Sequence, residues 1–440
     1  MERPVSIAPL VTFRIAFGFI MFVSTVRYLW MGWVDTQLIQ PSVHFHYYGF
    51  EWVKPLPGNW LYLVFFLLLL STVAITIGAY YRFFATLFFV LFSYVELIDL
   101  TYYLNHYYFV SVVSFMMIFV PANRSLSFDV AVRKVNPLNQ VSAWCIAIFK
   151  IQIAIVYVYA GVAKINYDWL VQALPLSIWL PAKTGIPLIG WIFKYQFTAY
   201  LLSWFGMLFD TFIILGLLFK KTRLPAYFLV IIFHLMTGIL FQIGIFPLVM
   251  ILGVAIFFSS ERHQRIITKL ETLFYKKTAS TSVEPLQERN RTLYPFIICF
   301  MAFQILFPWR YLLYPGNVFW TEEGYRFSWR VMLMEKAGTA TFFVKDGENG
   351  REGSVRNAQF LNPHQEKQMS MQPDMILQYA HFLDEYYLQK GMKDPIVRAE
   401  CEVTLNGRRS RLLIDPTIDL SEIKDGWKPK DWITPFQENE

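Results

Sequence analysis

The residues of this sequence that are best suited to chemistry are ionisable side chains within or at the ends of strongly apolar segments. A charged group is costly to place in a bilayer, so each of these positions is a candidate for a functional role. The candidates are Arg14, Glu96, Asp99, His106, Lys150, Lys164, Asp210 and His234. These residue types suit proton transfer, in which a positioned base accepts a proton from a bound substrate.

Lys164 is the strongest candidate base. It follows the apolar segment 143–163, in the run Tyr-Ala-Gly-Val-Ala-Lys-Ile-Asn-Tyr-Asp-Trp at residues 159–169. A lysine at such an interface can extend its amine into water. If aromatic neighbours shelter it instead, desolvation favours the neutral amine, which is a base. The small residues Ala160 and Gly161 allow another backbone or a flat ligand to approach closely.

A second group of polar residues is expected at the same depth as Lys164. His106, preceded by Asn105, opens the apolar segment 106–120 at the outer side. A base candidate, a second titratable group and an amide are therefore predicted to converge on one face.

Structural roles are the alternative for several of these residues. Asp210 and His234 lie near the middle of adjacent antiparallel segments and could simply hydrogen-bond each other, because polar pairs commonly join membrane helices. Arg14 and Lys150 lie toward the cytoplasmic ends of their segments, from which long basic side chains can reach the membrane surface.

Other patterns indicate no further chemistry. His44 and His46 alternate as metal ligands can, but no third ligand is evident nearby, so no metal site is expected. Cys145, Cys299 and Cys401 are interpreted as ordinary thiols rather than as a disulfide framework. The sequence contains no P-loop, no GxSxG elbow, no HExxH and no dinucleotide fingerprint.

The elements that must position these groups are membrane spans. Of the 440 residues, 55% are hydrophobic and only 16% are charged, whereas soluble domains average about a quarter charged residues. The apolar blocks are long enough to cross a ~30 Å hydrocarbon core. We therefore predict a multi-pass α-helical membrane protein with about nine transmembrane helices. These are residues 8–30, 60–79, 83–101, 106–120, 143–163, 197–218, 224–241, 243–258 and 293–309.

Two of these boundaries need comment. No small-residue cleavage site follows the first apolar run, so residues 8–30 are predicted to be a retained span. The division near Gln242 is open, since the run Ile-Gly-Ile-Phe-Pro at 243–247 could be a turn or a kink inside one bent helix.

Basic residues predict the orientation of the spans. With the amino terminus in the cytoplasm, the inner side holds Arg3, Arg14, Arg82, Arg124, Arg133, Lys134, Lys220, Lys221, Arg223, Arg262, Arg265, Lys269, Lys276, Lys277, Arg289 and Arg291. The outer side before residue 310 holds only Arg27, Lys54, Lys164, Lys183 and Lys194. With nine spans, the C-terminal region is then periplasmic, extracellular or lumenal.

The basic residues of the membrane part also account for the net charge of the chain. Residues 310–440 carry 17 Lys and Arg against 20 Asp and Glu, so the formal +7 of the chain arises in residues 1–309. The basic loops are expected to meet anionic lipid, and no nucleic-acid partner is predicted.

Residues 310–440 differ in character and are predicted to form an extracytoplasmic α+β domain, with residues 1–309 as the transmembrane catalytic domain. Thr339–Lys345 alternates like a strand and is followed by turn chemistry at 346–350. Residues 373–390 have helical periodicity. The run 399–405, Asn406-Gly407, 408–414 indicates a β-hairpin. Residues 276–292 are interpreted as a cytoplasmic linker.

The segment around Lys164 resembles the vitamin K-dependent γ-glutamyl carboxylase family. The animal enzymes have Ala-Gly-Val-Lys-Lys-Leu-Asp-Ala-Asp-Trp at the end of a span, and residues 160–169 are similar to that run. Further similar segments follow in order along the family pattern: Asn105-His106, 152–157, 208–210, Phe233-His234, 241–246, 324–329 and 415–419. The sequence is thus identified as a short member of the family, of the type with a horizontally transferred transmembrane domain.

This resemblance implies a particular activity. A base deprotonates vitamin K hydroquinone (phylloquinol or menaquinol), O2 adds, and a strongly basic alkoxide forms on the way to the epoxide. The alkoxide removes the γ-proton of a substrate glutamate, and the carbanion captures CO2. The resemblance makes Lys164 the hydroquinone base, with His106 assisting carbanion formation and Asn105 stabilising the developing anion. It places Tyr159, Gly161, Trp169 and His234 at the quinol. The implied partners are a glutamate-containing protein or peptide and membrane lipid.

The sequence also departs from the family pattern. The first of the two family lysines is Ala163 here, and the acidic residue that follows is Asn166. The chain is shorter than the animal enzymes. Two alternatives therefore stay open: a quinol-oxidising membrane enzyme with a different acceptor, and a non-catalytic lipid- or quinone-binding protein resembling a transporter. The sequence leaves the oligomeric state unknown.

Overall fold

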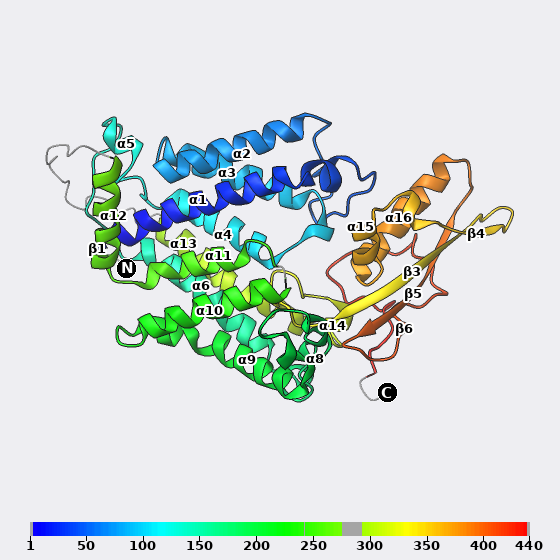
Figure 1. The fold of residues 1–440 in the computed structure, drawn as a ribbon. Helices are drawn as coiled ribbons and strands as arrows, with labels where there is room; N and C mark the ends of the chain where they lie inside the picture. The colour runs from blue at the N-terminus through cyan, green and yellow to red at the C-terminus, as the bar shows by residue number, and fades with distance from the viewer. Residues whose placement is uncertain (1–2, 242, 275–292, 438–440) are drawn as a thin grey trace.

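The protein divides into a helical bundle and a smaller α+β part, as the computed structural model shows (Figure 1). The structure describes residues 3–241, 243–274 and 293–437. Six helices of this part of the chain are long and apolar enough to cross a membrane. They are α1 (Ala8–Trp30), α2 (Trp60–Ile77), α6 (Trp144–Ala163), α9 (Gln196–Leu218), α10 (Arg223–Phe241) and α13 (Leu293–Leu306) with its 3-10 continuation Phe307–Leu313. Their length and composition indicate a membrane protein.

The other predicted spans form shorter helices. These are α3 (Tyr81–Leu97), α4 (Asn105–Phe119) and α11 (Phe246–Val254). After a bend of 114°, α11 and its 3-10 continuation are followed by α12 (Ser260–Phe274), and counting this bent pair as one span raises the number of candidates to seven. Gln242 itself and the predicted linker 276–292 lie outside the described residues. Of the two possibilities left open near Gln242, the turn is observed, because Gly244 and Ile245 form a turn between the end of α10 at Phe241 and the start of α11 at Phe246. The nine-span topology therefore stays a prediction.

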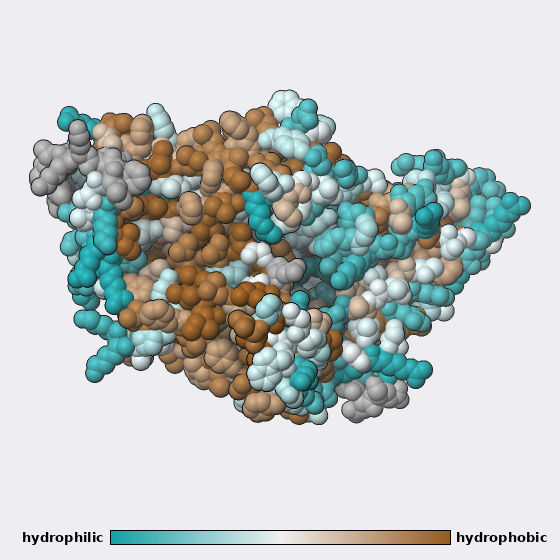
Figure 2. Space-filling view, viewed as in Figure 1, coloured by the Kyte–Doolittle hydropathy of each residue, from teal (hydrophilic) through white to brown (hydrophobic). Residues whose placement is uncertain are grey.

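The surface of the bundle is suited to lipid. Figure 2 shows a broad hydrophobic band over the helices, with hydrophilic side chains at the end of the bundle and over the α+β part. Phe66, Phe212 and Ile232 are among the large apolar side chains that the protein itself leaves exposed. Exposed apolar surface of this extent marks a membrane-facing or partner-facing region.

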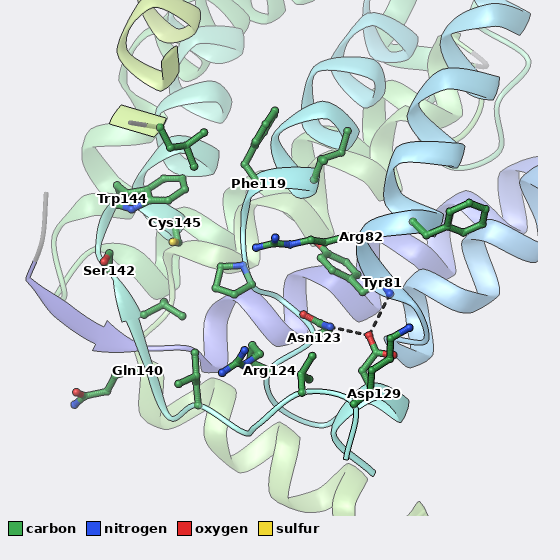
Figure 3. Close-up of a pocket in the computed structure, with 18 of the residues that line it drawn as sticks. Tyr81, Arg82, Phe119, Asn123, Arg124, Asp129, Gln140, Ser142, Trp144 and Cys145 are labelled. Atoms are coloured by element: carbon green, nitrogen blue, oxygen red, sulfur yellow. Dashed lines mark hydrogen bonds between the residues drawn. The ribbon is translucent and has the colours of Figure 1, made fainter. Parts of the chain in front are cut away.

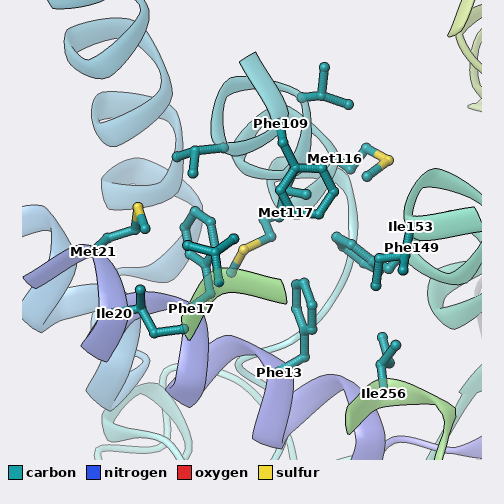
Figure 4. Close-up of a cluster of buried hydrophobic side chains, with 14 of the residues drawn as sticks. Phe13, Phe17, Ile20, Met21, Phe109, Met116, Met117, Phe149, Ile153 and Ile256 are labelled. Atoms are coloured by element: carbon teal, nitrogen blue, oxygen red, sulfur yellow. The ribbon is translucent and has the colours of Figure 1, made fainter. Parts of the chain in front are cut away.

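Phenylalanine, methionine and isoleucine side chains fill the centre of the bundle, where α1, α4 and α6 meet (Figure 4). The rings of Phe13 and Phe149 lie 4.7 Å apart between centroids, a distance at which aromatic pairs attract. A glycine allows α1 and α2 to pack closely, since a Cβ on Gly18 would lie 2.4 Å from the Thr76 hydroxyl. Small residues at such crossings are typical of membrane helix packing.

The α+β part is built on an antiparallel four-stranded sheet with the order β4-β3-β5-β6. Its strands are β3 (Lys336–Lys345), β4 (Glu352–Ser354), β5 (Ile396–Leu405) and β6 (Arg411–Leu412), and its helices are α15 (Pro363–Met369) and α16 (Pro373–Gln389). The apolar stripe of α16 covers the sheet, with the Tyr379 ring 4.8 Å from that of Phe342. The predicted strand at 339–345 and the predicted helix at 373–390 are confirmed.

The predicted hairpin forms with an altered register. Asn406 and Gly407 have φ angles of 52° and 74°, as a tight turn with positive φ requires. A two-residue turn would pair Val403 with residue 410, but Val403 pairs with Arg411 instead, and β6 begins only there. The extra residue lets Arg408 turn away from the sheet, toward the helical bundle.

Short elements complete the fold. They are β1 (Pro4–Ser6), β2 (Gln140–Ser142), α5 (Phe128–Ala131), α7 (Tyr167–Leu170), α8 (Leu176–Trp179) and α14 (Val318–Thr321). Strand β1 pairs with β2 and holds the amino-terminal segment beside the start of α6. Helices α7 and α8 follow the other end of α6, next to the α+β part (Figure 1).

Candidate active site

Lys164 caps the C-terminal end of α6 and points into the protein. Its Nζ lies 2.8 Å from Asp210 Oδ2, on the neighbouring helix α9, and 3.1 Å from the carbonyl oxygen of Ala160. The Trp169 ring lies 5.2 Å from Nζ, and Lys164 is only 5% exposed. Of the two possibilities that the sequence leaves open, the sheltered amine is the one observed, and the side chain does not extend into water. The ion pair explains why burial is possible, because a buried charge needs a partner.

A small cavity lies beside this ion pair, and we call it the inner chamber. Its volume is about 90 Å³. Helices α6, α9, α10 and α11 supply most of its walls, and the short helices α7 and α8, Ile243, and Val331 and Met332 of the α+β part supply the rest. Apart from Lys164 and Asp210, its lining is dominated by aromatic and aliphatic side chains. The inner chamber is thus an apolar space with an acid–base pair at its wall.

His234 is a further titratable group of the inner chamber. Its Nε2 lies 2.7 Å from the Tyr157 hydroxyl, and its Nδ1 is buried without a hydrogen-bond partner. Asp210 and His234 therefore do not form the hydrogen bond that was considered as an alternative. The full positive charge of Lys164 is the stronger partner for the carboxylate, which leaves one nitrogen of His234 available in the chamber.

His106 and Asn105 lie in the first turn of α4 and line a second cavity of about 610 Å³, which we call the outer chamber. His106 is buried, and its ring lies 5.6 Å from that of Phe246. Two hydrogen bonds fix the Asn105 amide, because its Nδ2 donates to the Arg330 carbonyl oxygen (3.0 Å) and its Oδ1 accepts from the Tyr103 hydroxyl (3.1 Å).

The two chambers adjoin each other. Both are lined by Phe241, Ile243, Phe246, Val331 and Met332. The Phe246 ring lies 5.6 Å from His106 on one side and 5.6 Å from His234 on the other. The expectation of one shared face needs correction, since Lys164 and His106 line neighbouring chambers with this aromatic side chain in the wall between them.

The remaining predicted quinol contacts are divided. Trp169 lines the inner chamber, with its indole N–H donating to the Ser203 carbonyl oxygen at 2.8 Å. Tyr159 instead lines a separate cavity of about 290 Å³, and its hydroxyl donates to the carbonyl oxygen of Ile305. Gly161 packs against α9, where an added Cβ would lie 2.4 Å from the Thr211 hydroxyl. The sequence left open whether Gly161 allows close approach of another backbone or of a flat ligand, and the close neighbour is the backbone of α9.

One part of the site was missing from the sequence analysis, namely a link between the Lys164 segment and the α+β part. Asp168, four residues after Lys164, accepts hydrogen bonds from both terminal nitrogens of Arg408, at 2.6 and 2.8 Å, and from the Asn406 amide at 2.6 Å. We call this group the clamp. Burial alone would raise the pKa of Asp168, but the hydrogen bonds from Arg408 and Asn406 outweigh it and hold that pKa below its ordinary value.

The family departure at Asn166 has a structural role in the same segment. Its side-chain oxygen accepts a hydrogen bond from the Trp169 backbone N–H at 2.9 Å and caps α7. Asparagine suits this position as well as aspartate does. The change from the animal pattern therefore leaves the local fold of the segment intact.

Another large cavity, of about 890 Å³, lies at the opposite end of α6, near Trp144 (Figure 3). Its carboxylate, Asp129, accepts hydrogen bonds from the Asn123 amide (2.7 Å) and the Tyr81 backbone N–H (3.2 Å). These contacts hold the loop against α3. Because Lys164 lies at the far end of α6, this cavity is no part of the candidate active site.

Arg14 and the paired histidines have structural roles. Arg14 is fully buried and donates to the carbonyl oxygens of Ala122 (2.8 Å) and Leu126 (2.5 Å), so the expectation that it reaches the membrane surface is wrong. The guanidinium thus supplies hydrogen-bond donors to the carbonyl oxygens of the loop that contains Ala122 and Leu126.

The paired histidines form no metal site with Asp99 as a third ligand, although His44 lies 3.4 Å from Asp99. Among the residues the structure describes, no group of three or more His, Cys, Asp or Glu side chains is arranged to hold a metal ion.

Comparison with known families agrees with this architecture. The family model of the HTTM domain matches residues 2–261, and the model of the vitamin K-dependent gamma-carboxylase lumenal domain matches residues 289–439. No solved structure matches the chain. The first match contains Lys164 and His106, and the second contains Arg408 and the residues of the α+β part that line the chambers. The chain therefore belongs to the HTTM domain family and, with a gamma-carboxylase lumenal domain joined to it, is a member of the vitamin K-dependent γ-glutamyl carboxylase family.

Proposed function

We propose that the protein is a vitamin K hydroquinone-dependent carboxylase that converts protein glutamate to γ-carboxyglutamate, coupled to epoxidation of the quinol. The observation that carries this proposal is the burial of Lys164 against Asp210 beside an apolar chamber. A structural lysine at the end of a span would face the membrane surface, whereas this one faces a cavity. Buried acid–base groups in a cavity are typical of active sites.

The inner chamber suits a quinol. Phylloquinol or menaquinol partitions into lipid, and its ring is flat and largely apolar like the walls of the chamber. The chamber offers two polar positions, the Lys164–Asp210 pair and the unpartnered Nδ1 of His234, and a quinol has two hydroxyl groups to satisfy them. When bound, the quinol supplies with O2 the oxidative chemistry that drives removal of the glutamate γ-proton.

Lys164 acts as the base for the quinol hydroxyl, and Asp210 makes this possible. A lysine accepts a proton only as the neutral amine. The ion pair shares one proton, which can reside on the amine or on the carboxylate without changing the net charge of the pair. When the proton resides on Asp210, the lone pair of the Lys164 amine is free and the buried site stays neutral. Neutrality matters because an unpaired charge is costly to bury. Asp210 is thus a positioning residue and a proton acceptor for Lys164.

The outer chamber holds the acceptor side chain. His106 lies at its wall and assists formation of the carbanion, while the fixed Asn105 amide stabilises developing negative charge. Separation of the chambers by Phe246 keeps the glutamate beside the reactive site and helps exclude water from it. CO2, a small apolar molecule, then adds to the carbanion.

The proposal also includes the orientation of the protein in the membrane. We place the amino terminus in the cytoplasm and residues 310–440 on the periplasmic, extracellular or lumenal side, with the chambers at the outer end of the bundle. The basic residues of the cytoplasmic segments support this orientation.

The test measures two products in purified, detergent-solubilised protein. Reduced phylloquinone and reduced menaquinone are supplied in turn with O2, labelled bicarbonate and a short glutamate peptide. The proposal predicts epoxide and labelled peptide together. Epoxide without label indicates an enzyme with a different acceptor, and absence of both products with every quinol indicates a protein that binds lipid or quinone without catalysis.

A further inference from the structure

Most of the cationic side chains that line the outer chamber already contact other side chains of the protein. Lys336 donates to Glu322 at 2.8 Å, with both side chains buried. Arg326 forms an ion pair with Asp374, outside the bundle. Carboxylates thus neutralise Lys336 and Arg326, and the Arg330 guanidinium lies against two aromatic rings, those of Tyr311 and Phe319.

Arg27, at the C-terminal end of α1, differs from them. Among the residues the structure describes, no acidic group forms an ion pair with it, and its side chain makes no hydrogen bond. Its guanidinium carbon lies 4.8 Å from the centre of the Trp33 ring, which holds the side chain against an aromatic face. Arg27 therefore presents a positioned positive charge whose hydrogen-bond donors have no partner in this part of the chain.

A glycine makes room for this guanidinium. Gly244, in the turn before α11, has φ +63°, and an added Cβ would lie 3.2 Å from Nη1 of Arg27. The turn that brings Phe246 to the wall of the chamber thus also leaves space around the arginine. Arg27, His106 and Phe246 all line the same chamber.

The carboxylates of the outer chamber do not neutralise Arg27. Glu322 is paired with Lys336, and Glu335 accepts a hydrogen bond from the Trp179 indole at 2.5 Å. The chamber reaches the surface at Lys367, which is exposed and has no ion pair among the described residues. An anion entering from this side meets one cation at the rim and a second beside His106.

We propose that Arg27 binds the side-chain carboxylate of the acceptor glutamate in the outer chamber. This inference rests on the proposed function and assigns its acceptor site. An arginine matches a carboxylate with two parallel hydrogen bonds, which fixes the side chain in position and orientation. It also offsets the charge of the carboxylate next to the carbon that loses its proton, where negative charge develops. Arg27 would thereby orient the γ-carbon toward His106 and the wall shared with the inner chamber.

The test compares Arg27→Gln with Arg27→Lys and with Arg82→Gln. The last variant removes the same charge from the cavity at the opposite end of the bundle. Binding of a fluorescent glutamate peptide and of its glutamine counterpart is measured in detergent, together with the KM and kcat of peptide carboxylation. We expect Arg27→Gln to weaken binding of the glutamate peptide and raise its KM by about tenfold or more, the loss of a charge-assisted hydrogen bond. Arg27→Lys should recover part of the loss, and Arg82→Gln should resemble wild type.

The outcomes separate this inference from the proposed function. If wild type carboxylates the peptide and Arg27→Gln keeps a KM within twofold of wild type, the inference is overturned and the proposed function stands. If wild type has no turnover but binds the glutamate peptide in an Arg27-dependent way, the inference stands and the proposed function fails. If the glutamate and glutamine peptides bind equally to every variant, no carboxylate site exists and the inference is overturned.

Discussion

Arg408 donates two hydrogen bonds, 2.6 and 2.8 Å long, to the Asp168 carboxylate and so joins the hairpin of the α+β part to the segment that follows Lys164. Both side chains are mostly buried, at 19% and 16% exposed. On the other side of the site, the Arg330 carbonyl oxygen holds the amide of Asn105. The α+β part thus holds the segment that follows Lys164 beside one chamber and the amide of Asn105 in the other.

The clamp predicts a loss of order near Lys164 when it is broken. Arg408→Gln should destabilise the fold by about 1–3 kcal/mol, because the buried Asp168 loses its charged partner. Hydrogen exchange of the amides of residues 164–170 should accelerate. Lys393→Gln is the matched control, since it breaks an exposed pair with Glu348 that contributes about 0–1 kcal/mol. Equal exchange in the two variants would show that the clamp does not order the segment.

The clamp also predicts a pH dependence. The pKa of Asp168 is lower in the folded protein than its ordinary value, so its contribution to stability is present above the ordinary aspartate pKa and is lost as pH falls through the folded pKa. Stability measured from pH 8 to 5 should therefore show no change due to this pair, with a decline only below about pH 4. Asp168→Asn should flatten that acid decline. A decline of the same size in the variant would mean that other carboxylates cause it.

Asp210→Asn tests the partner of the proposed base. Asparagine keeps the size of the side chain but cannot take a proton from Lys164, so we expect quinol epoxidation to fall by about 10²-fold or more, as loss of a positioned proton acceptor does. Thermal unfolding with bound quinone controls for folding. An epoxidation rate within threefold of wild type would mean that Asp210 is only structural.

Phe246 predicts coupling between the chambers. Phe246→Ala removes the ring between His106 and His234, which should destabilise the protein by about 3–5 kcal/mol and let water pass between the chambers. The ratio of carboxylated peptide to epoxide should then fall, because the reactive site is quenched before it meets the glutamate. Phe246→Leu fills most of the space and should keep a higher ratio. An unchanged ratio in Phe246→Ala would contradict a separating role.

Much of the fold follows from the sequence, for physical reasons. Apolar blocks of sufficient length predict membrane spans. Alternation of apolar residues predicts β3, and their helical periodicity predicts α16. The short helices α3, α4 and α11 show the limit, since an apolar run predicts a helix better than it predicts whether the helix crosses the membrane. The shift of register in the hairpin depends on Arg408, whose distant partner Asp168 no local pattern reveals.

The candidate site was only partly predictable. An isolated charge in an apolar segment marks Lys164 and His106, but the choice of partners depends on how helices pack. Asp210 was assigned to His234 as an alternative because both lie in adjacent helices, whereas the helix packing brings Asp210 to Lys164 instead. Tyr159 lies five residues before Lys164, a spacing that turns its side chain away from the inner chamber and into another cavity.

Hydroquinone-dependent epoxide formation, measured for wild type and for Lys164→Ala, tests the role of Lys164 without intermediate steps. In the proposed function, this buried amine accepts the proton of the quinol. We expect epoxide formation by wild type and a loss of about 10²- to 10⁴-fold in the variant, with quinone binding and thermal unfolding confirming that the variant is folded. Epoxide formation by a folded Lys164→Ala protein within tenfold of wild type would contradict that role.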